Sequence, residues 1–213
     1  MAAYIVALTG ASGAVYGLRL IDELLKGGYG VDMTASPTGL LIMEHELGLD
    51  VKEAGVLEAV RGYLKEERRR AGEAGATVKS SGPKGVLNYY PAHSIAAPMA
   101  SGSSLARNMV VCPCSMGTLS RISTGASSNL IERAADCVLK ERGRLVLVPR
   151  ETPLNSIHLE NMLRLSRSGA VVLPAMPGFY SKPSTIDELI DFIVGKVLDV
   201  LGIENSLFKR WEG

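Results

Sequence analysis

Short runs of β-branched and other apolar residues alternate along this chain with segments whose apolar residues recur at helical spacing. Each strand then connects to the next through a helix, which is typical of a parallel sheet with helices on both faces. The predicted strands cover residues 4–9, 31–35, 86–89, 109–112, 145–148 and 171–173. The predicted helices cover 15–26, 38–47, a segment from about 51 into a charged stretch, a short one from 115, and then 129–141, 156–168 and 186–201. We expect one α/β domain over residues 1–213, with a polar loop around 68–85 and a short tail at 203–213.

Composition excludes several classes of function. Lys and Arg number 23 and Asp and Glu 22, so a net charge of +1 gives no general attraction to nucleic acid or to an anionic membrane. Aromatic residues are only 5%, which argues against base stacking. No apolar run approaches the roughly 18 residues that span a bilayer, and the first residues lack the basic segment of a secretory signal. Three cysteines cannot form a disulfide framework, so we expect a reducing cytoplasm.

Polar clusters follow five of the predicted strands. They are residues 9–13, 36–39, 112–115, 150–151 and 176–180. The carboxyl ends of parallel strands share one edge of a sheet, and ligands bind there. The sequence therefore predicts a ligand site on that edge.

The first cluster belongs to a glycine motif. Gly10, Gly13 and Gly17 form GxxGxxxG rather than the dinucleotide motif GxGxxG, and Ser36 stands where an acid would hold a ribose hydroxyl. NAD is therefore disfavoured. A Gly- and Ser-rich turn that opens a helix still suits one phosphate, and a mononucleotide such as FMN fits. The alternative interpretation is simple strand–helix packing. Residues 115–118 repeat the arrangement.

Other polar residues have two interpretations each. Arg133 and Lys140 share one helix face, and with Arg150 they could hold a second phosphate. The alternative is a solvated face, with the charges paired to Glu132, Asp136 and Glu141. Cys112 and Cys114 are interpreted as buried apolar residues, because a lone CxC is a weak metal motif, and we predict no metal. The three histidines are scattered, so a hydrolytic triad is unsupported.

Several longer segments resemble the UbiX flavin prenyltransferases. They are GASGAVYGLRL (10–20), ASGSS (100–104), CPCSMGTLS (112–120), the block from Asn129 to Leu163, and GAVVLPAMPGFY (169–180). The similarity extends from the first strand to Trp211 and lapses mainly over 51–94. It implies a three-layer Rossmann-like flavoprotein fold. It also implies a metal-independent transferase that joins a dimethylallyl group from dimethylallyl monophosphate to N5 and C6 of reduced FMN. The product, prenylated FMN, serves UbiD-type decarboxylases, and the family assembles as a homododecamer with sites where subunits meet.

The resemblance also assigns roles to individual residues. For FMN binding it implies Gly10, Ala11, Ser12, Ser36, Ser115, Met116, Gly117, Thr118 and Arg150. For the prenyl phosphate it implies Ser101, Arg133, Lys140, Tyr180 and Lys196. Glu46 is the expected base near flavin N5, and Ser12 relays its proton. Glu151 and Lys140 complete the catalytic set beside the phosphate.

Two departures from the family pattern and two rival functions remain. Lys196 replaces an Arg of some members, and Ile95 replaces a Trp, so a forked contact and a π surface are lost.

One rival is an FMN-dependent decarboxylase of the peptidyl-cysteine or phosphopantothenoylcysteine type, which requires a catalytic His and a PxMNxxMW-like segment. The chain has Pro98-Met99-Ala100-Ser101 instead. The other rival is a non-catalytic flavin carrier, which needs no such set of charges.

Overall fold

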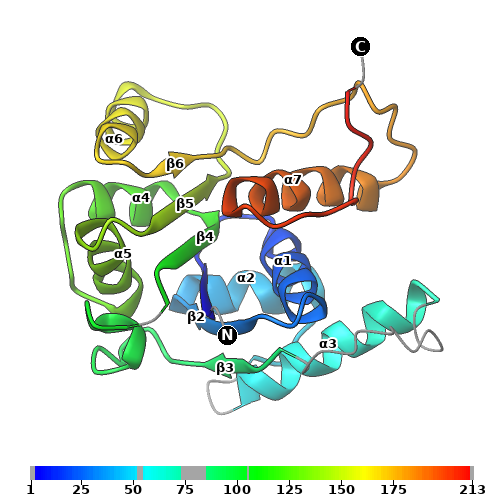
Figure 1. The fold of residues 1–213 in the computed structure, drawn as a ribbon, viewed down its shortest axis with the longest axis horizontal. Helices are drawn as coiled ribbons and strands as arrows, with labels where there is room; N and C mark the ends of the chain where they lie inside the picture. The colour runs from blue at the N-terminus through cyan, green and yellow to red at the C-terminus, as the bar shows by residue number, and fades with distance from the viewer. Residues whose placement is uncertain (1–2, 52–54, 73–84, 105, 212–213) are drawn as a thin grey trace.

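Six parallel strands form one sheet in the computed structural model, which describes residues 3–51, 55–72, 85–104 and 106–211. The strands are β1 Ala3–Leu8, β2 Gly30–Ala35, β3 Leu87–Tyr89, β4 Asn108–Cys114, β5 Arg144–Pro149 and β6 Val171–Val172. Their order is β3-β2-β1-β4-β5-β6 (Figure 1). The order reverses at β1, so the carboxyl ends of the paired strands β1 and β4 mark the topological switch point of a doubly wound fold.

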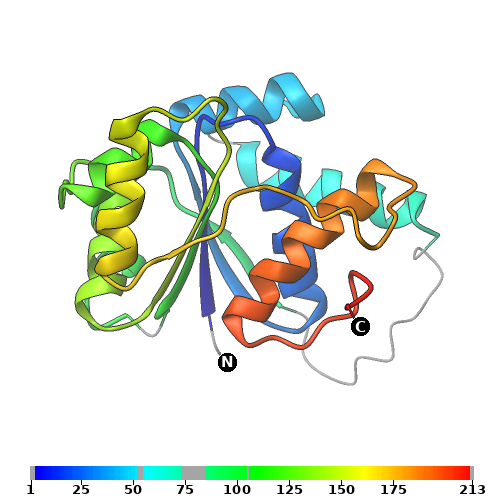
Figure 2. The same ribbon diagram turned by 90° about the horizontal axis from the view of Figure 1, so that it is seen from above.

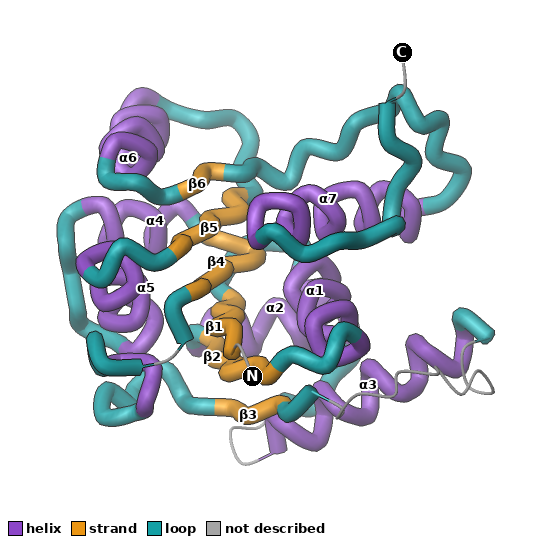
Figure 3. Tube along the Cα trace, viewed as in Figure 1, coloured by secondary structure: helices purple, strands orange, loops and turns teal. Residues whose placement is uncertain are grey.

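Helices cover both faces of this sheet, as the sequence predicts (Figures 2 and 3). They are α1 Ala14–Lys26, α2 Pro37–Leu47, α3 Val56–Arg70, α4 Met116–Ser123, α5 Leu130–Lys140, α6 Ser156–Arg167 and α7 Ile186–Leu201, with the short 3₁₀ helix η3 at Pro98–Ala100. Helices α1, α2, α3 and α7 contribute buried residues to one core, and α4, α5 and α6 to the other. The three-layer α/β fold is therefore confirmed.

Alternation along the central strand builds the two cores. Tyr4, Val6 and Leu8 of β1 pack on the α1–α7 side, whereas Ile5 and Ala7 pack on the α5 side. Such a strand is buried on both faces, which explains why it has a continuous apolar sequence rather than an alternating one. Removal of this apolar area from water is the main term that holds the layers together.

Gly17 lets α1 approach the sheet closely. A Cβ placed on this residue would lie 2.3 Å from the backbone oxygen of Cys112 in β4, which is closer than any real contact. The last glycine of the GxxGxxxG motif thus serves helix–strand packing. This part of the alternative interpretation of the motif is correct.

Some predicted boundaries differ from the structure. Helix α3 continues to Arg70, so the first residues of the predicted polar loop at 68–85 are helical. Charged side chains on a solvent-facing helix pair at i,i+3 and i,i+4, as Arg69 and Arg70 do with Glu66, and this pairing extends the helix. Residues 52–54 and 73–84, which include most of that loop, lie outside the described residues. Within the part of the chain that the structure describes, no helix combines the length and apolarity needed to cross a bilayer.

Candidate active site

Four of the predicted polar clusters meet at the carboxyl edge of the sheet. The turn after β1 lies between the start of α4, where the Ser115 amide donates to Thr9 Oγ1 at 2.8 Å, and Arg150 after β5, whose Nε donates to the Ser12 carbonyl at 3.2 Å. Ser36 follows β2, the neighbour of β1 on its other side. Segments more than 100 residues apart in the chain are thus brought to the switch point. We call this assembly the rim group; it comprises Gly10, Ala11, Ser12, Ser36, Glu46, Ser115, Met116, Gly117, Thr118 and Arg150.

Glu46 occupies the amino end of α1. Its carboxylate accepts hydrogen bonds from the Gly13 amide at 2.9 Å and the Ala14 amide at 3.0 Å. Gly13 has φ of 107°, a conformation that glycine adopts without strain and that turns these amides toward α2. The anion that the sequence predicts at this helix start is therefore, in this structure, a side chain of the protein itself.

The same contacts keep Glu46 ionised. Partial burial raises the pKa of its carboxyl, but hydrogen bonds from Ser12, Gly13 and Ala14 and the nearby Arg150 charge outweigh this effect, so the pKa is lowered. A carboxylate that is charged at neutral pH and open to solvent on one side can accept a proton.

Two further helices direct their amino ends toward the rim. Ser36 caps α2 by accepting from the Gly39 amide at 3.0 Å, and Ser115 caps α4 by accepting from the Thr118 amide at 3.3 Å. Each cap satisfies one amide of a first turn that has further amides without an intrahelical acceptor. These amides, the capping hydroxyls and the Arg150 guanidinium fit a phosphate-bearing mononucleotide such as FMN.

The residues predicted for the prenyl phosphate form two separate groups. Tyr180 and Lys196, the α7 group, lie on the α7 side: the Tyr180 ring packs edge-on against Phe192 of α7 at 5.9 Å and against Trp211 at 5.7 Å. Lys196 Nζ is 4.0 Å from Asp199, whose carboxylate Arg210 holds at 2.7 and 3.0 Å. Within the described residues, Asp199 is the only acid close to Lys196, and Asp199 is bound more closely by Arg210.

Ser101, Arg133 and Lys140, the α5 group, lie on the opposite side of the sheet. Arg133 Nε donates to the Ala100 carbonyl at 3.3 Å, and a Cβ on Gly102 would lie 2.7 Å from Lys140 Nζ. Both contacts bring α5 to the loop that contains Ser101. Lys140 ends α5 just before β5 begins, so it lies at the amino edge of the sheet rather than at the rim.

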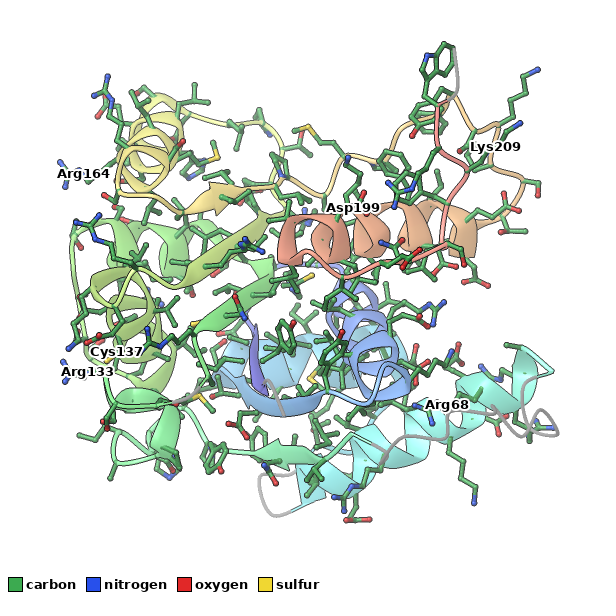
Figure 4. All side chains as sticks on the ribbon, in the orientation of Figure 1. Arg68, Arg133, Cys137, Arg164, Asp199 and Lys209 are labelled. Atoms are coloured by element: carbon green, nitrogen blue, oxygen red, sulfur yellow. The ribbon has the colours of Figure 1, made fainter. Side chains whose placement is uncertain are left out.

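One chain therefore does not assemble the whole predicted prenyl-phosphate pocket. Figure 4 shows Arg133 and Cys137 on α5 at the left edge of the molecule, away from Asp199 on α7 near its centre. Within a single chain the α5 group lies away from the rim, because α5 packs on the core opposite to that of α7. Glu151 does follow β5 next to Arg150, where it accepts from the Thr152 amide at 3.1 Å.

Glu132 and Arg121 form a pair that the sequence does not predict. Glu132 is fully buried rather than part of a solvated face, and it binds Arg121 of α4. The expected partners of the α5 cations are instead Asp136, 3.8 Å from Arg133, and Glu141, 3.2 Å from Lys140. The predicted Asn129 cap is present, since its side chain accepts from the Glu132 amide at 3.1 Å.

The three cysteines are buried, and His158 has a structural role. Burial raises the pKa of the Cys114 thiol to about 12, and Cys112 is equally buried, so neither is a ready thiolate. Among the described residues, no group of three or more His, Cys, Asp or Glu side chains is arranged to hold a metal ion. His158 belongs to the capping box of α6, and His45 is an exposed residue of α2.

Comparison with known proteins agrees with this architecture. The Flavoprotein family model matches residues 2–198, which defines the class of protein. The chain is 50% identical over 208 residues to the flavin prenyltransferase UbiX of Halalkalibacterium halodurans, a match that covers 98% of this chain and 92% of that protein. The chain belongs to the UbiX flavin prenyltransferase family.

Solved structures support the same assignment. The crystal structure of AnUbiX (PadA1) in complex with FMN and dimethylallyl pyrophosphate has a TM-score of 0.83 and 36% identity, and the match covers 100% of this chain and 98% of that one. A dodecameric FMN-dependent UbiX-like decarboxylase from Escherichia coli O157:H7 has a TM-score of 0.79 and 35% identity, with 99% and 100% covered. The peptidyl-cysteine decarboxylase EpiD, at 15% identity and a TM-score of 0.58, shares the fold alone.

Proposed function

We propose that this protein transfers the dimethylallyl group of dimethylallyl monophosphate to N5 and C6 of reduced FMN, which yields prenylated FMN. Membership of the UbiX family supports this reaction. The observation that carries it is Glu46, an ionised carboxylate fixed by two backbone amides at the switch point of the sheet. A passive carrier needs no proton acceptor at that place.

In this proposal the rim group holds the flavin. Ser36, the turn 115–118 and Arg150 bind its phosphate and polar edges, and Gly10, Ala11 and Ser12 contact it from the turn after β1. The helix amino ends and the Arg150 charge support this role, because both attract an anion. Bound FMN supplies the nucleophilic nitrogen of the reaction.

Glu46 is the proposed general base. It accepts the N5 proton while the bond from N5 to the prenyl carbon forms and the carbon–oxygen bond of the phosphate ester breaks. The phosphate leaves with the bonding electrons. The bond to C6 then forms at the expense of the prenyl double bond, which gains a proton on its other carbon as C6 loses its own proton, so this second step has no leaving group. Ser12, whose hydroxyl contributes to the lowered pKa of Glu46, relays the proton.

Residues from two copies of the chain build the proposed prenyl-phosphate pocket. Tyr180 and Lys196 come from one copy, and Ser101, Arg133 and Lys140 from a neighbour. The separation of the two groups by the sheet supports this arrangement, as does the dodecameric relative. A homododecamer is therefore the proposed assembly.

The charges in this composite pocket have distinct roles. Lys140, Arg133 and Lys196 stabilise the negative charge that develops on the leaving phosphate. Glu151, beside Arg150 at the rim, is the proposed proton donor to that phosphate. A pocket closed by the neighbouring copy also keeps water away from the allylic carbon.

The proposed destination of prenylated FMN is a UbiD-type decarboxylase, and the proposed location is the cytoplasm. Three free, buried cysteines support a reducing compartment. Family membership supports the recipient.

Release of phosphate tests the reaction. With reduced FMN and dimethylallyl monophosphate, we expect one phosphate per flavin consumed, and no release when FMN is omitted. Phosphate release at the same rate without flavin would indicate a phosphatase and contradict the proposal.

A further inference from the structure

The strongest unexplained feature outside the proposed reaction is a fully buried carboxylate. Glu132, in the first turn of α5, has no solvent-exposed surface. It accepts from the Ser128 amide at 2.9 Å, from the Ser128 hydroxyl at 2.5 Å and from the Asn129 side-chain amide at 2.8 Å. A buried charge requires such partners. Helix capping needs only some of them, and the remaining one is a cation from another helix.

That cation is Arg121, in the last turn of α4. Its Nε donates to Glu132, while its Nη2 donates to Thr118 Oγ1 at 3.4 Å. A Cβ on Gly117 would lie 3.5 Å from its Nη1. About half of the Arg121 side chain is exposed, so the guanidinium lies between the buried carboxylate and the surface of the turn 115–118.

Arg121 in turn constrains the hydroxyls of that turn. Thr118 Oγ1 accepts both from Arg121 and from Ser115 Oγ, the latter at 3.1 Å. Ser115 Oγ also accepts from the Thr118 amide as the cap of α4. A chain of hydrogen bonds therefore runs from Glu132 through Arg121 to both hydroxyls, which are the side chains that the proposed function assigns to the flavin.

We propose that Arg121 and Glu132 are a positioning pair for flavin binding. Glu132 fixes the orientation of the guanidinium, and Arg121 fixes Thr118 and Ser115 and holds a positive charge beside Gly117. The ligand of this turn is an anionic mononucleotide. The inference rests on the proposed function for the identity of that ligand, but it concerns binding and not prenyl transfer.

Flavin affinity tests the pair directly. We expect R121A to weaken FMN binding about ten- to hundredfold, since a hydrogen bond to a charged group has a contribution of that size. R121K keeps the positive charge but loses the forked guanidinium, so its Kd for FMN should lie between those of R121A and the wild type. Quenching of FMN fluorescence gives the Kd. R69A, which removes the partner of Glu66 in an exposed ion pair on α3, is the matched control and should bind FMN normally.

A double-mutant cycle with E132Q separates positioning from folding. If Glu132 acts through Arg121, adding E132Q to R121A should change the Kd for FMN by less than twofold, although E132Q alone weakens binding. Millimolar methylguanidinium should restore part of the FMN affinity that R121A has lost and leave the affinity of R69A unchanged. Thermal unfolding of each variant without ligand is recorded alongside.

Three results would overturn the pair. They are an R121A variant that binds FMN as tightly as the wild type, additive losses in the cycle, or a lower unfolding temperature as the only effect. R121A alone suffices if E132Q fails to fold, because Arg121 is half-exposed. A wild type that binds FMN without prenylating it would contradict the proposed function and leave this inference standing.

Discussion

At the scale of single residues, Glu46 has two roles, one in the structure and one in the proposed reaction. It must be ionised to hold the amino end of α1, and it must accept a proton during the proposed reaction. The Gly13 and Ala14 amides satisfy the first requirement and leave one side of the carboxylate open for the second.

Replacement of this carboxylate separates catalysis from binding. We expect E46Q to lower the rate of prenyl transfer about 10²- to 10⁴-fold, the usual contribution of a general base. FMN should still bind, because Ser36, Thr118 and Arg150 are unchanged. Phosphate release and fluorescence quenching measure the two effects. E44Q, an exposed change on the same helix, is the control. A normal rate in E46Q would remove Glu46 from the mechanism.

The lowered pKa of Glu46 also predicts a pH dependence of stability. Because the folded pKa lies below the ordinary value of 4.5, the stabilisation is fully present above that pH and is lost as the pH falls through the folded pKa. Urea unfolding from neutral pH downward should therefore show a steeper loss of stability in the wild type than in E46Q below pH 4.5. Parallel curves would contradict the assigned ion–amide contacts.

At the scale of elements, the junction of α1 with β4 depends on one missing side chain. G17A places a Cβ 2.3 Å from the Cys112 carbonyl, so we expect the free energy of unfolding to fall by about 1–3 kcal/mol or more. Gly62 lies in α3, where a Cβ would have no neighbour within 4 Å. G62A should therefore raise the free energy of unfolding by about 0.5–1 kcal/mol. Chemical denaturation measures both, and equal effects would contradict the close approach.

Local signals explain which elements the sequence predicts well. Apolar periodicity and the Asn129 cap locate α5, and the strand ends locate the rim, because these patterns involve residues near each other in the chain. The Arg121–Glu132 pair joins two helices across a loop, and each residue alone resembles an ordinary surface charge. Glu46 of α2 is 32 residues from its partner Ala14 in α1. Only the fold therefore reveals that the Glu46 carboxylate binds the amides at the amino end of α1.

At the scale of the whole molecule, the sheet divides the predicted prenyl-phosphate residues between two faces. Sequence resemblance assigns them to one pocket but does not tell which copy of the chain supplies each. Because α5 and α7 pack on opposite cores, the proposed activity depends on which copy supplies each residue.

Mixed assemblies test the composite pocket. K140A and Y180F should each be nearly inactive, but co-expressed copies should recover about a quarter of the wild-type activity, because random association pairs two intact halves at that frequency. K140A mixed with R133A is the matched control and should recover nothing, since both residues come from the same copy. Inactive K140A–Y180F mixtures would contradict the proposed division of the site.

The mass of the flavin after reaction tests the central proposal most directly. The protein is incubated without oxygen with reduced FMN and dimethylallyl monophosphate, and the released flavin is analysed by mass spectrometry. We predict that the flavin gains one five-carbon prenyl unit, with E46Q as the inactive control. A flavin that binds and is released with its mass unchanged would contradict the account and favour a carrier or a decarboxylase.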